Sequence, residues 1–437
     1  MNSLRDSKPK GWNEKKIKEF ARTHSGGTPL RSNEEFYKGN IRWVKSSELK
    51  QKYLYDTEEY ITELALKKSS ARMADSNSIL FAMYGATAGD MTILKKASSL
   101  NQAVLAISIN EDEDIDLEYF YYFLKRLVYK LIFMSQGGGQ PNLSKGIVDN
   151  LYLLYPKSKL EQIAIATILS KVDETIQATQ TTIQAAEKLK KALMQNLLTG
   201  KLKPDGTWRT EKEFKESKLG LIPKNWEIKT IKDLSTQVTD GEHYTPDRSD
   251  SGYYLLSARN IKNSYLDLSK VDYVNGEVLQ KIQRRCNPKE GDIFISCSGT
   301  IGNVCIVPKG LNAGMVRSAA LVKLKKDKIE PEYAELVLQS FPLQNQMKVS
   351  VASSVQGNIF QGAIKKLKIA YPPSKKERDA IATKMTSISI LIKQKQSKIK
   401  TLQRLKKSLM QNLLTGKIRV DVDKINEIIS KTKNQKS

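Results

Sequence analysis

The string LKKALMQNLLTGKL occupies residues 189–202, and LKKSLMQNLLTGKI occupies residues 405–418. Twelve of these fourteen positions are identical, and the strings lie 216 residues apart in a chain of 437 residues. A repeat of that length is a domain with its connector, well above the size of a solenoid repeat. The sequence therefore predicts two related units in one chain, and an internally symmetric molecule suits a target with two parts.

The repeat extends beyond this string, although unevenly. Across residues 1–140 and 206–355 only scattered positions agree. Repeats that agree at their ends but differ in between suggest two domains that dock in the same way but recognise different targets. Short matches persist at the same or nearly the same offset: Ile165-Ala166-Thr167 with Ile381-Ala382-Thr383, Trp12 with Trp226, and Thr28-Pro29 with Thr245-Pro246.

Two long helices are predicted at the ends of the repeats. Apolar or small residues recur in steps of three and four from Ile165 to Leu197, and nine of the ten equivalent positions from Ile381 to Leu413 are apolar. Gly200 and Gly416 stand where C-terminal caps belong. Each helix of about 40 residues would be about 60 Å long. The obvious partner for each apolar stripe is the other helix in a coiled coil. The alternative is that each helix packs only on its own globular domain. This alternative fits less well, because a helix of that length extends beyond a single domain.

Charge differs between the two helices. From Ala380 to Val420 there are ten Lys or Arg and no acidic residue. The first helix is mixed and contains Glu161, Asp173, Glu174 and Glu187. Opposite charges beside an apolar seam can set the partner and its orientation. A solvated basic face explains the same pattern equally well.

The whole chain is strongly basic. Its 72 Lys and Arg against 47 Asp and Glu give a formal net charge of +25. Such a field attracts polyanions, of which nucleic acid is the commonest, whereas the alternative is a surface of solubilising lysines.

The sequence gives little support for a metal site, a disulfide or a membrane span. Cys286, Cys297 and Cys305 are odd in number without CxxC spacing, and the only histidines are His24 and His243. These facts argue against a disulfide framework and a metal site. No run of 18 apolar residues occurs, and the start MNSLRDSKPK has no apolar signal-peptide core. We therefore expect a cytoplasmic protein without membrane contact.

The remaining segments predict an α+β fold with two globular domains. The expected boundaries are residues 1–157, a helix over 158–202, a polar linker over 203–222, a second domain over 223–373, a helix over 374–418 and a basic tail over 419–437. Helices are predicted over 119–134 and 331–340, the second stopped by Pro342. Strands are predicted over 41–44, 78–83, 104–109, 151–155, 253–256, 292–296, 304–307, 319–324 and 367–371.

No catalytic signature is present in the sequence. There is no GxxxxGK[ST] phosphate loop and no Asn-Pro-Pro-Tyr or Asp-Pro-Pro-Tyr string. Tyr371-Pro372-Pro373-Ser374 lacks the leading Asn or Asp and is interpreted as a strand-to-helix turn. His24 and His243 lie at roughly corresponding places in the repeats, where either a ligand contact or a solvated loop position is plausible.

Several longer strings resemble a known family. They are THSGGTPLRSNEEFYKGNIRWVKSSELK (23–50), KKSSARMADSNSILFAMYGATAGDMTIL (67–94), LNQAVLAI (100–107) and QGGGQPNLSKGIVDNLYLLYPKSKLEQIAIA (136–166). The second repeat carries the framework in SGTIGN (298–303), SVQGNIF (354–360) and YPPSKKERDAIA (371–382). Together with the duplication, they resemble the specificity subunit of a type I restriction–modification system.

This resemblance implies a fold and a set of partners. It implies two target recognition domains held apart by two antiparallel helices with internal pseudo-two-fold symmetry. Each domain would recognise one half of a bipartite double-stranded DNA target. The helices would dock two methyltransferase subunits that bind S-adenosylmethionine, and a restriction subunit would use ATP and Mg²⁺. No cofactor and no catalytic residue are then expected on this chain itself.

Polar loops rich in Gly, Ser, Thr, Asn and Gln are the candidate DNA contacts, because side chains at base edges give specificity. Each loop also has a plain turn-forming explanation. Arg259 and Gln140 could pair bidentately with guanine and adenine, although a phosphate contact or a surface role is equally open. The candidate docking residues are Leu189, Leu193, Leu197, Leu405, Leu409 and Leu413. The candidate DNA contacts are His24, Ser25, Thr28, Lys45, Ser46, Tyr84, Thr87, Gln136, Gln140 and Asn142, then His243, Tyr244, Thr245, Ser257, Arg259, Asn260, Ser298, Thr300, Ser354, Gln356 and Asn358.

Overall fold

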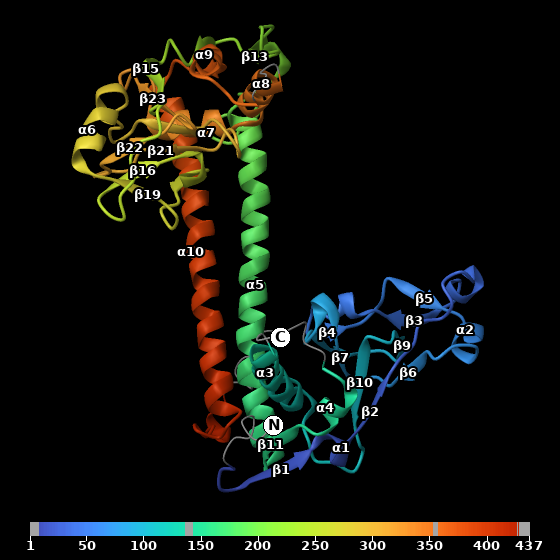
Figure 1. Ribbon diagram of the computed structural model, residues 1–437. Helices are drawn as coiled ribbons and strands as arrows, with labels where there is room; N and C mark the ends of the chain where they lie inside the picture. The colour runs from blue at the N-terminus through green and yellow to red at the C-terminus, as the bar shows by residue number, and fades with distance from the viewer. Residues whose placement is uncertain (1–7, 136–142, 353–356, 426, 428–437) are drawn as a thin grey trace. The chain divides into compact units, whose positions relative to one another are not determined.

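The chain divides into two compact units, each built from both repeats. A computed structural model describes residues 8–135, 143–352, 357–425 and 427 (Figure 1). Unit 1 contains Met1–Gln180 and Ser397–Ser437, and unit 2 contains Thr181–Gln396. The two long helices, α5 (Lys159–Leu197) and α10 (Lys375–Leu413), each contribute one part to each unit.

Unit 1 contains a mixed α+β domain with two sheets. The larger sheet has the strand order β2-β10-β7-β8-β4, and the smaller has the order β5-β3-β9-β6. The strands of the larger sheet are β2 (Ala21–Ser25), β10 (Val104–Ile109), β7 (Ile79–Ala82), β8 (Met91–Leu94) and β4 (Tyr53–Leu54). Those of the smaller sheet are β5 (Glu59–Ile61), β3 (Ile41–Val44), β9 (Ser98–Leu100) and β6 (Arg72–Ala74).

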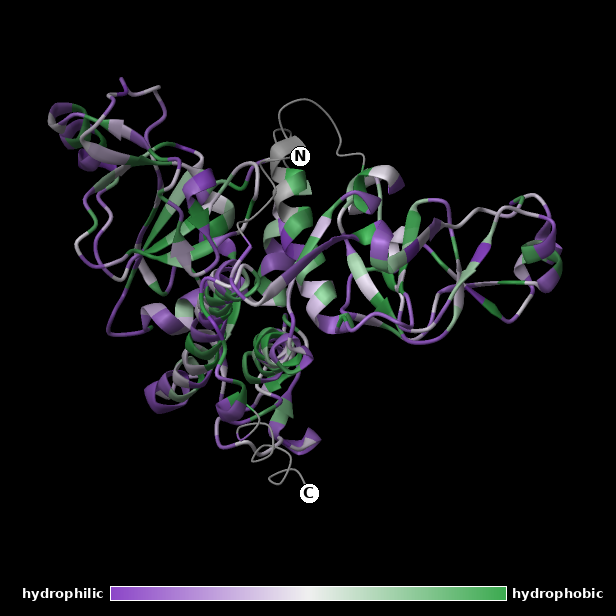
Figure 2. Cartoon of the chain, turned by 90° about the horizontal axis from the view of Figure 1, so that it is seen from below, coloured by the Kyte–Doolittle hydropathy of each residue, from purple (hydrophilic) through white to green (hydrophobic). Residues whose placement is uncertain are grey.

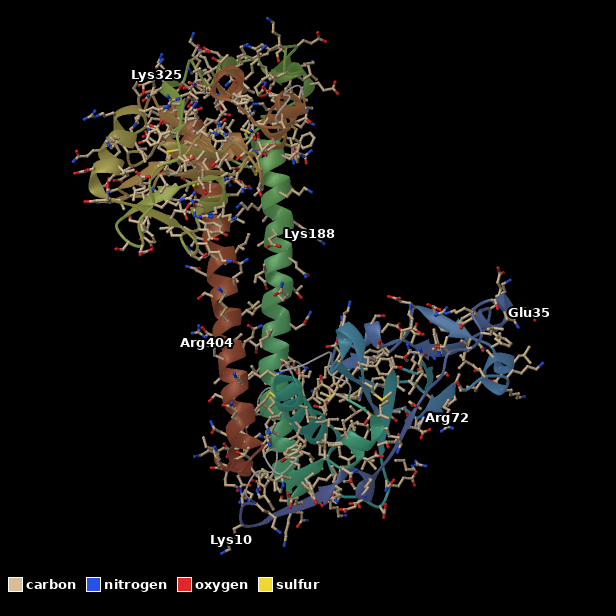
Figure 3. The ribbon with its side chains drawn as sticks, viewed as in Figure 1. Lys10, Glu35, Arg72, Lys188, Lys325 and Arg404 are labelled. Atoms are coloured by element: carbon tan, nitrogen blue, oxygen red, sulfur yellow. The ribbon has the colours of Figure 1, made fainter. Side chains whose placement is uncertain are left out.

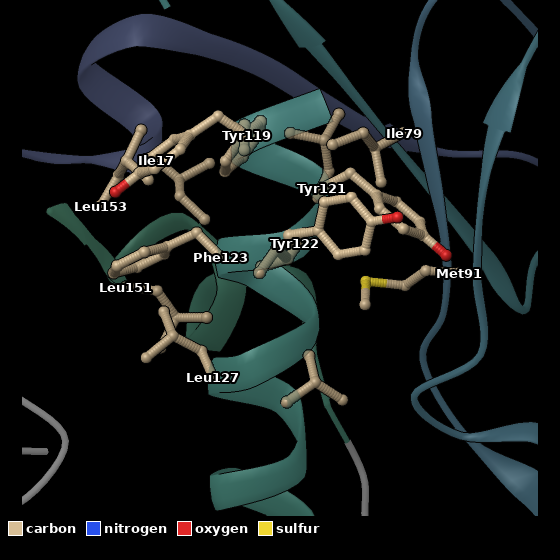
Figure 4. Packing of buried hydrophobic residues seen from close by; sticks show 14 of the residues in the cluster. Ile17, Ile79, Met91, Tyr119, Tyr121, Tyr122, Phe123, Leu127, Leu151 and Leu153 are labelled. Carbon is tan, nitrogen blue, oxygen red and sulfur yellow. The ribbon is translucent and has the colours of Figure 1, made fainter. Parts of the chain in front are cut away.

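An aromatic helix forms the core of unit 1. Helix α3 (Leu117–Ser135) buries Tyr119, Tyr122 and Phe123 between the sheet and the strand that leads into α5 (Figure 4). The Tyr119 hydroxyl donates a hydrogen bond of 2.8 Å to the Leu154 carbonyl, so the polar end of a buried ring has a partner. The short elements nearby are α1 (Ile17–Phe20), α2 (Glu63–Lys67), α4 (Lys145–Asp149) and the antiparallel pair β1 (Trp12–Lys16) and β11 (Tyr152–Pro156).

Unit 2 repeats this plan. Its sheets have the orders β15-β23-β20-β21 and β19-β16-β22. The strands are β15 (Ser235–Asp240), β23 (Ala319–Leu324), β20 (Ile293–Ser296), β21 (Val304–Ile306), β19 (Asp272–Val274), β16 (Tyr253–Leu256) and β22 (Ala313–Met315). The remaining elements are β14 (Glu227–Thr230) paired with β24 (Lys368–Tyr371), the hairpin β17 (Ile261–Lys262) and β18 (Tyr265–Leu266), and helices α6 (Gly276–Arg285), α7 (Pro331–Gln339), α8 (Phe341–Ala352) and α9 (Gln361–Lys366).

The helix predicted over 331–340 is confirmed as α7, which ends at Gln339, but the second helix α8 that begins at Phe341 was not predicted. Pro342 therefore lies in the first turn of a new helix. In that turn a backbone N–H has no intrahelical partner, so proline loses nothing there.

The capping glycines are confirmed as special positions. Gly200 and Gly416 have φ angles of +72° and +68°, which L side chains rarely adopt. A Cβ at Gly200 would lie 2.3 Å from Pro223, and one at Gly416 would lie 2.5 Å from Pro9. At the end of each long helix, therefore, only glycine allows both the positive φ angle and the close contact with the first segment of a repeat.

The two long helices pack antiparallel within each unit. In unit 1, Ile165 and Leu169 near the start of α5 share a core with Met410 and Leu413 near the end of α10. In unit 2, the end of α5 shares a core with the start of α10 through Leu197, Leu198, Ile381 and Met385. The alternative in which each helix packs only on its own repeat is therefore excluded.

Ion pairs accompany this helix packing in unit 1. Arg419 holds both carboxylate oxygens of buried Glu161 at 2.6 Å, and Lys406 lies 2.5 Å from Asp173. Acidic residues of the first helix and basic residues after Ala380 thus pair, as expected for charges that set orientation. Arg419 and Val420 belong to unit 1, so the predicted basic tail begins with ordered residues.

The predicted linker over 203–222 is folded onto unit 2. It contains η5 (Glu211–Glu213) and the strands β12 (Phe214–Lys215) and β13 (Ile222–Pro223), which pair with each other. Arg209 donates to the Gly200 carbonyl at 2.7 Å and to Glu377 at 2.6 Å. The segment therefore connects the repeats as an ordered structure.

Not every position of the predicted apolar stripe is buried. Both long helices carry apolar and polar residues along their length (Figure 2). Leu189 is 52% exposed and its repeat equivalent Leu405 is 46% exposed, so these two positions lie outside the packed seam. None of the helices in the described part of the chain is long and apolar enough to cross a membrane.

Candidate nucleic-acid interface

The first predicted loop of unit 1 follows β2. His24 and Ser25 end that strand, and His24 Nε2 lies 2.9 Å from the Met73 carbonyl. The Thr28 hydroxyl donates to the Gln102 side chain. A Cβ on Gly27 would lie 2.1 Å from Ser70, so this glycine is explained by close packing. Thr28 and His24 are thus at the surface but already have partners in the protein.

The second loop is tied to a residue that the sequence prediction missed. Lys45 precedes the turn η3 (Ser46–Glu48), and its amine lies 3.0 Å from Glu58 and 2.8 Å from Glu59. Arg31 approaches the same Glu59 carboxylate at 2.5 Å. The hydrogen bond from Arg31 lowers the pKa of Glu59, whereas hydrogen bonds to Glu59 and Glu58 raise the pKa of Lys45.

Aromatic rings hold Arg31 from another side. Its guanidinium lies 4.5 Å from the ring centroid of Tyr37 and 4.8 Å from that of Trp43. Such stacking fixes a planar guanidinium in one orientation. The Arg31 position could have been found from the sequence, because Thr28-Pro29-Leu30-Arg31 matches Thr245-Pro246-Asp247-Arg248.

The third loop presents an aromatic side chain. Tyr84 follows β7 and is exposed, and Thr87 ends the short turn η4 (Gly85–Thr87) as a half-buried residue. Gly85 has a φ of +81° and open space around it, so its conformation is a turn requirement. The candidates Gln136, Gln140 and Asn142 lie outside the described residues.

In unit 2 the loop after β15 carries a charged cluster. His243 Nε2 lies 3.0 Å from Asp240, and Arg285 at the end of α6 lies 2.9 Å from the same carboxylate. Burial opposes ionisation of Asp240, but hydrogen bonds from Arg285 and His243 outweigh it and lower its pKa. Tyr244 and Thr245 are exposed beside this cluster.

The two histidines do not occupy corresponding places. The Gly26 N–H bonds to the Val104 carbonyl and the Gly241 N–H to the Ala319 carbonyl, on equivalent strands β10 and β23. His24 lies two residues before the first of these glycines, and His243 lies two residues after the second. The proposed correspondence was therefore wrong, because the second loop is longer.

The loop after β16 contains one structural and one exposed candidate. Asn260 in the turn η6 (Ala258–Asn260) is buried, accepts the Ser257 N–H and donates to the Asp267 and Lys270 carbonyls. Asn260 is therefore unavailable to DNA in this conformation, and Ser257 is half-buried against it. Arg259 is exposed and lies 2.5 Å from Asp272.

The remaining candidate loops of unit 2 show few contacts that bear on DNA binding. Ser298 is half-buried and Thr300 is exposed, with the Thr300 carbonyl accepting a hydrogen bond from Ser296 at 2.6 Å. Asn358 is half-buried, while Ser354 and Gln356 lie outside the described residues. Equivalent Lys188 and Arg404 project from the surfaces of α5 and α10 (Figure 3).

Only some of the candidate docking leucines are accessible. Leu197 and Leu413 are buried in the two cores, and Leu193 and Leu409 pack against them. These four were predicted as partner contacts, but they hold the chain together. Leu189 and Leu405 remain as exposed leucines at equivalent positions.

The cysteines are unsuited to nucleophilic chemistry. Cys286, Cys297 and Cys305 are all buried, and burial raises the pKa of each thiol to about 12. A thiol needs a lowered pKa to react as a thiolate near neutral pH. Among the residues that the structure describes, no group of three His, Cys, Asp or Glu side chains could hold a metal ion.

Comparison with known proteins agrees with this geometry. The family model described as "Type I restriction modification DNA specificity domain" matches residues 9–188 and 223–403. The MjaVIII specificity subunit of a type I restriction enzyme from Methanocaldococcus jannaschii is 27% identical over 384 residues, covering 85% of this chain and 88% of that protein. The EcoBI specificity subunit from Escherichia coli is 25% identical over 282 residues, covering 63% and 58% of the two chains.

A solved structure shares the fold. The S subunit of a type I restriction–modification system from M. genitalium superimposes with a TM-score of 0.57 at 15% identity, covering 92% of this chain and 96% of that one. Two family matches, one in each repeat, agree with the repeated strand order and the paired helices. The chain belongs to the family of type I restriction–modification DNA specificity subunits, which recognise DNA sequence and are not themselves catalytic.

Proposed function

We propose that this chain recognises a bipartite DNA target, one half by each globular domain, and directs methyltransferase and restriction subunits to it. The observation that supports this proposal is that the two domains share a core strand order, β2-β10-β7-β8 with β5-β3-β9 in one and β15-β23-β20-β21 with β19-β16-β22 in the other, but differ at equivalent loops. Lys45 stands where Ser257 stands in the second domain, and Tyr84 where Ser298 stands. Different side chains on one scaffold suit two different half-sites.

Partner docking is part of the same proposal. Leu189 and Leu405 are exposed at equivalent positions, each followed by two lysines. Two equal surfaces suit two copies of one methyltransferase subunit. S-adenosylmethionine would be bound by that subunit, and ATP and Mg²⁺ by the restriction subunit, in the cytoplasm where the DNA lies.

The target is tested by sequencing DNA methylation in the source organism with and without this chain. The expected motif has two defined halves and an unread spacer, and it disappears when the chain is deleted. A contiguous motif, or a motif that persists without the chain, would contradict the proposal. Methyl transfer to DNA by the purified chain alone would show instead that the chain is an enzyme.

Docking is tested with Leu189→Asp and Leu405→Asp in the full chain. Each substitution is expected to remove one of two bound methyltransferase subunits, measured as the mass of the purified complex. Leu160→Asp and Ile390→Asp are matched controls, because both residues are exposed on the same helices but their repeat equivalents are Lys376 and Glu174. Equal losses from the controls would contradict this docking site.

A further inference from the structure

The smaller sheets of the two domains can be matched residue by residue. In unit 1, β3 pairs antiparallel with β5 and parallel with β9, and Trp43 lies opposite Glu59. In unit 2, β16 pairs antiparallel with β19 and parallel with β22, and Leu255 lies opposite Asp272. Glu59 and Asp272 therefore occupy the same position, although one is Glu and the other is Asp.

Each of these carboxylates holds two cations from two loops. Arg31 lies 2.5 Å from Glu59, and Arg248, from the matching Thr-Pro-x-Arg string, lies 3.2 Å from Asp272. The second cation comes from the turn after β3 or β16, namely Lys45 at 2.8 Å or Arg259 at 2.5 Å. We call each arrangement of one acid and two cations a carboxylate clamp.

In both clamps the arginines are the outer groups. The Arg31 side chain is 53% exposed, against 30% for Glu59. Arg248 and Arg259 are 60% and 53% exposed, against 25% for Asp272. In each clamp the carboxylate is thus the more buried group, and the guanidinium groups are the more exposed ones. Arg248 meets Asp272 through Nε, and its two terminal amino groups form no hydrogen bond or ion pair with the part of the chain that the structure describes.

Stability alone explains these clamps poorly. An ion pair in which the cation is exposed contributes little to stability, because water and salt screen it. In unit 2 one carboxylate between two arginines leaves a positive charge at the surface, which suits a polyanion, whereas in unit 1 Glu58 balances the charge of Lys45. Holding an arginine in place before binding also reduces the side-chain entropy that binding would cost. Two N–H donors in the plane of a fixed guanidinium match the O6 and N7 acceptors of guanine. Both terminal amino groups of Arg31 face Glu59, so its Nε edge would meet a base, whereas Arg248 meets Asp272 through Nε and would use its terminal amino groups.

We infer that Arg31 and Arg248 contact base edges, one in each half of the DNA target, and that Glu59 and Asp272 are the residues that position them. The inference rests on the proposed function and names side chains for it. Lys45 is also held by Glu58, so in unit 1 the amine supports the clamp and Arg31 makes the contact. In unit 2 the exposed Arg259 stands beside Arg248 on the same carboxylate.

The test measures binding of the full chain to fluorescent duplexes of stated sequence. One duplex carries both halves of the motif found by methylation sequencing, and two others have one half scrambled. Arg31→Ala is expected to weaken binding to the intact duplex about ten- to hundredfold, as for loss of one bidentate base contact. It should change binding less than about twofold when the half that it contacts is already scrambled. Arg248→Ala should show the same pattern for the other half.

Matched controls remove the same charge elsewhere in each domain. Arg22 and Arg284 are exposed arginines outside the clamps, so Arg22→Ala and Arg284→Ala should weaken all three duplexes slightly and equally. Glu59→Gln keeps the size of the side chain but not its charge. It is expected to raise affinity for scrambled DNA and to reduce discrimination between intact and scrambled duplexes, which a structural role would leave unchanged.

The outcomes separate this inference from the proposed function. If Arg31→Ala weakens every duplex equally, the arginine contacts phosphate and the inference fails. If Arg31→Ala and Arg248→Ala leave specific binding unchanged, the inference also fails while the proposed function stands. A wild-type chain that binds intact and scrambled duplexes equally would overturn the proposed function itself.

Discussion

If the DNA target is bipartite, as we propose, shortening both long helices by the same amount should shorten the spacer between its two halves. The change removes residues 179–185 from α5 and the equivalent residues 395–401 from α10. Seven residues are about two turns, so each remaining apolar stripe stays within about 20° of its original direction. At about 1.5 Å per residue each helix loses about 10 Å, which is the rise of about three base pairs.

The assay is methylation sequencing of a plasmid library with both half-sites separated by every spacer length. The shortened chain is expected to direct methylation to a spacer about three base pairs shorter, with both half-sites unchanged. A control deletes residues 179–185 alone. In this control the apolar stripes of α5 and α10 would be out of register by about two turns. The melting temperature should then fall, because apolar contacts between the two helices are lost. An unchanged spacer with altered half-site bases would refute the role of the helices in spacing.

Three further changes test the packing. Arg209→Ala removes the buried guanidinium from the half-buried Glu377 carboxylate, which among the described residues keeps only the Trp226 N–H, and should lower stability by about 2–4 kcal/mol in thermal unfolding. Lys38→Ala at an exposed pair should change stability by less than about 0.5 kcal/mol. Gly416→Ala should cost about 1–3 kcal/mol because of its positive φ and its contact with Pro9, and Gly362→Ala, in open space, serves as the control. Burial raises the pKa of Glu335 to about 7 from the ordinary value of 4.5, so its contribution to stability is full below pH 4.5 and is lost as the pH rises through 7. Glu335→Gln should therefore raise the melting temperature relative to wild type at pH 8 but not at pH 4.5, and equal differences at the two pH values would contradict this account.

Periodicity and turn residues predicted much of the fold. The predicted strands over 41–44, 104–109, 253–256 and 319–324 coincide with β3, β10, β16 and β23. The helix predicted over 158–202 begins one residue before α5 and extends five residues beyond its end. These predictions are correct because the spacing of apolar residues along the sequence is enough to indicate which side of an element is buried. The end of α7 before Pro342 was predicted, but the start of α8 at Phe341 was missed, because a proline is compatible both with the end of one helix and with the first turn of the next.

The candidate site was predicted less completely. Loop composition found Arg259 and Lys45, but it also selected Asn260, which is buried by hydrogen bonds to the backbone. Arg31 and Arg248 share a Thr-Pro-x-Arg string that would have revealed them, whereas Glu59 and Asp272 were missed because their equivalence depends on strand register across the sheet. A carboxylate in an outer strand has no sequence signal that ties it to an arginine in a different loop.

The capping glycines bear on how the gene of such a protein can change. Gly200 at the end of the first repeat packs on Pro223 and Trp226 at the start of the second, and Gly416 at the end of the second packs on Pro9 and Trp12 at the start of the first. Both junctions use the same contacts, although a peptide backbone joins only one of them. Neither unit therefore depends on which repeat is translated first. Recombination that exchanged or reordered the two halves would preserve both junctions, and one event could give a new pair of half-sites on an intact scaffold.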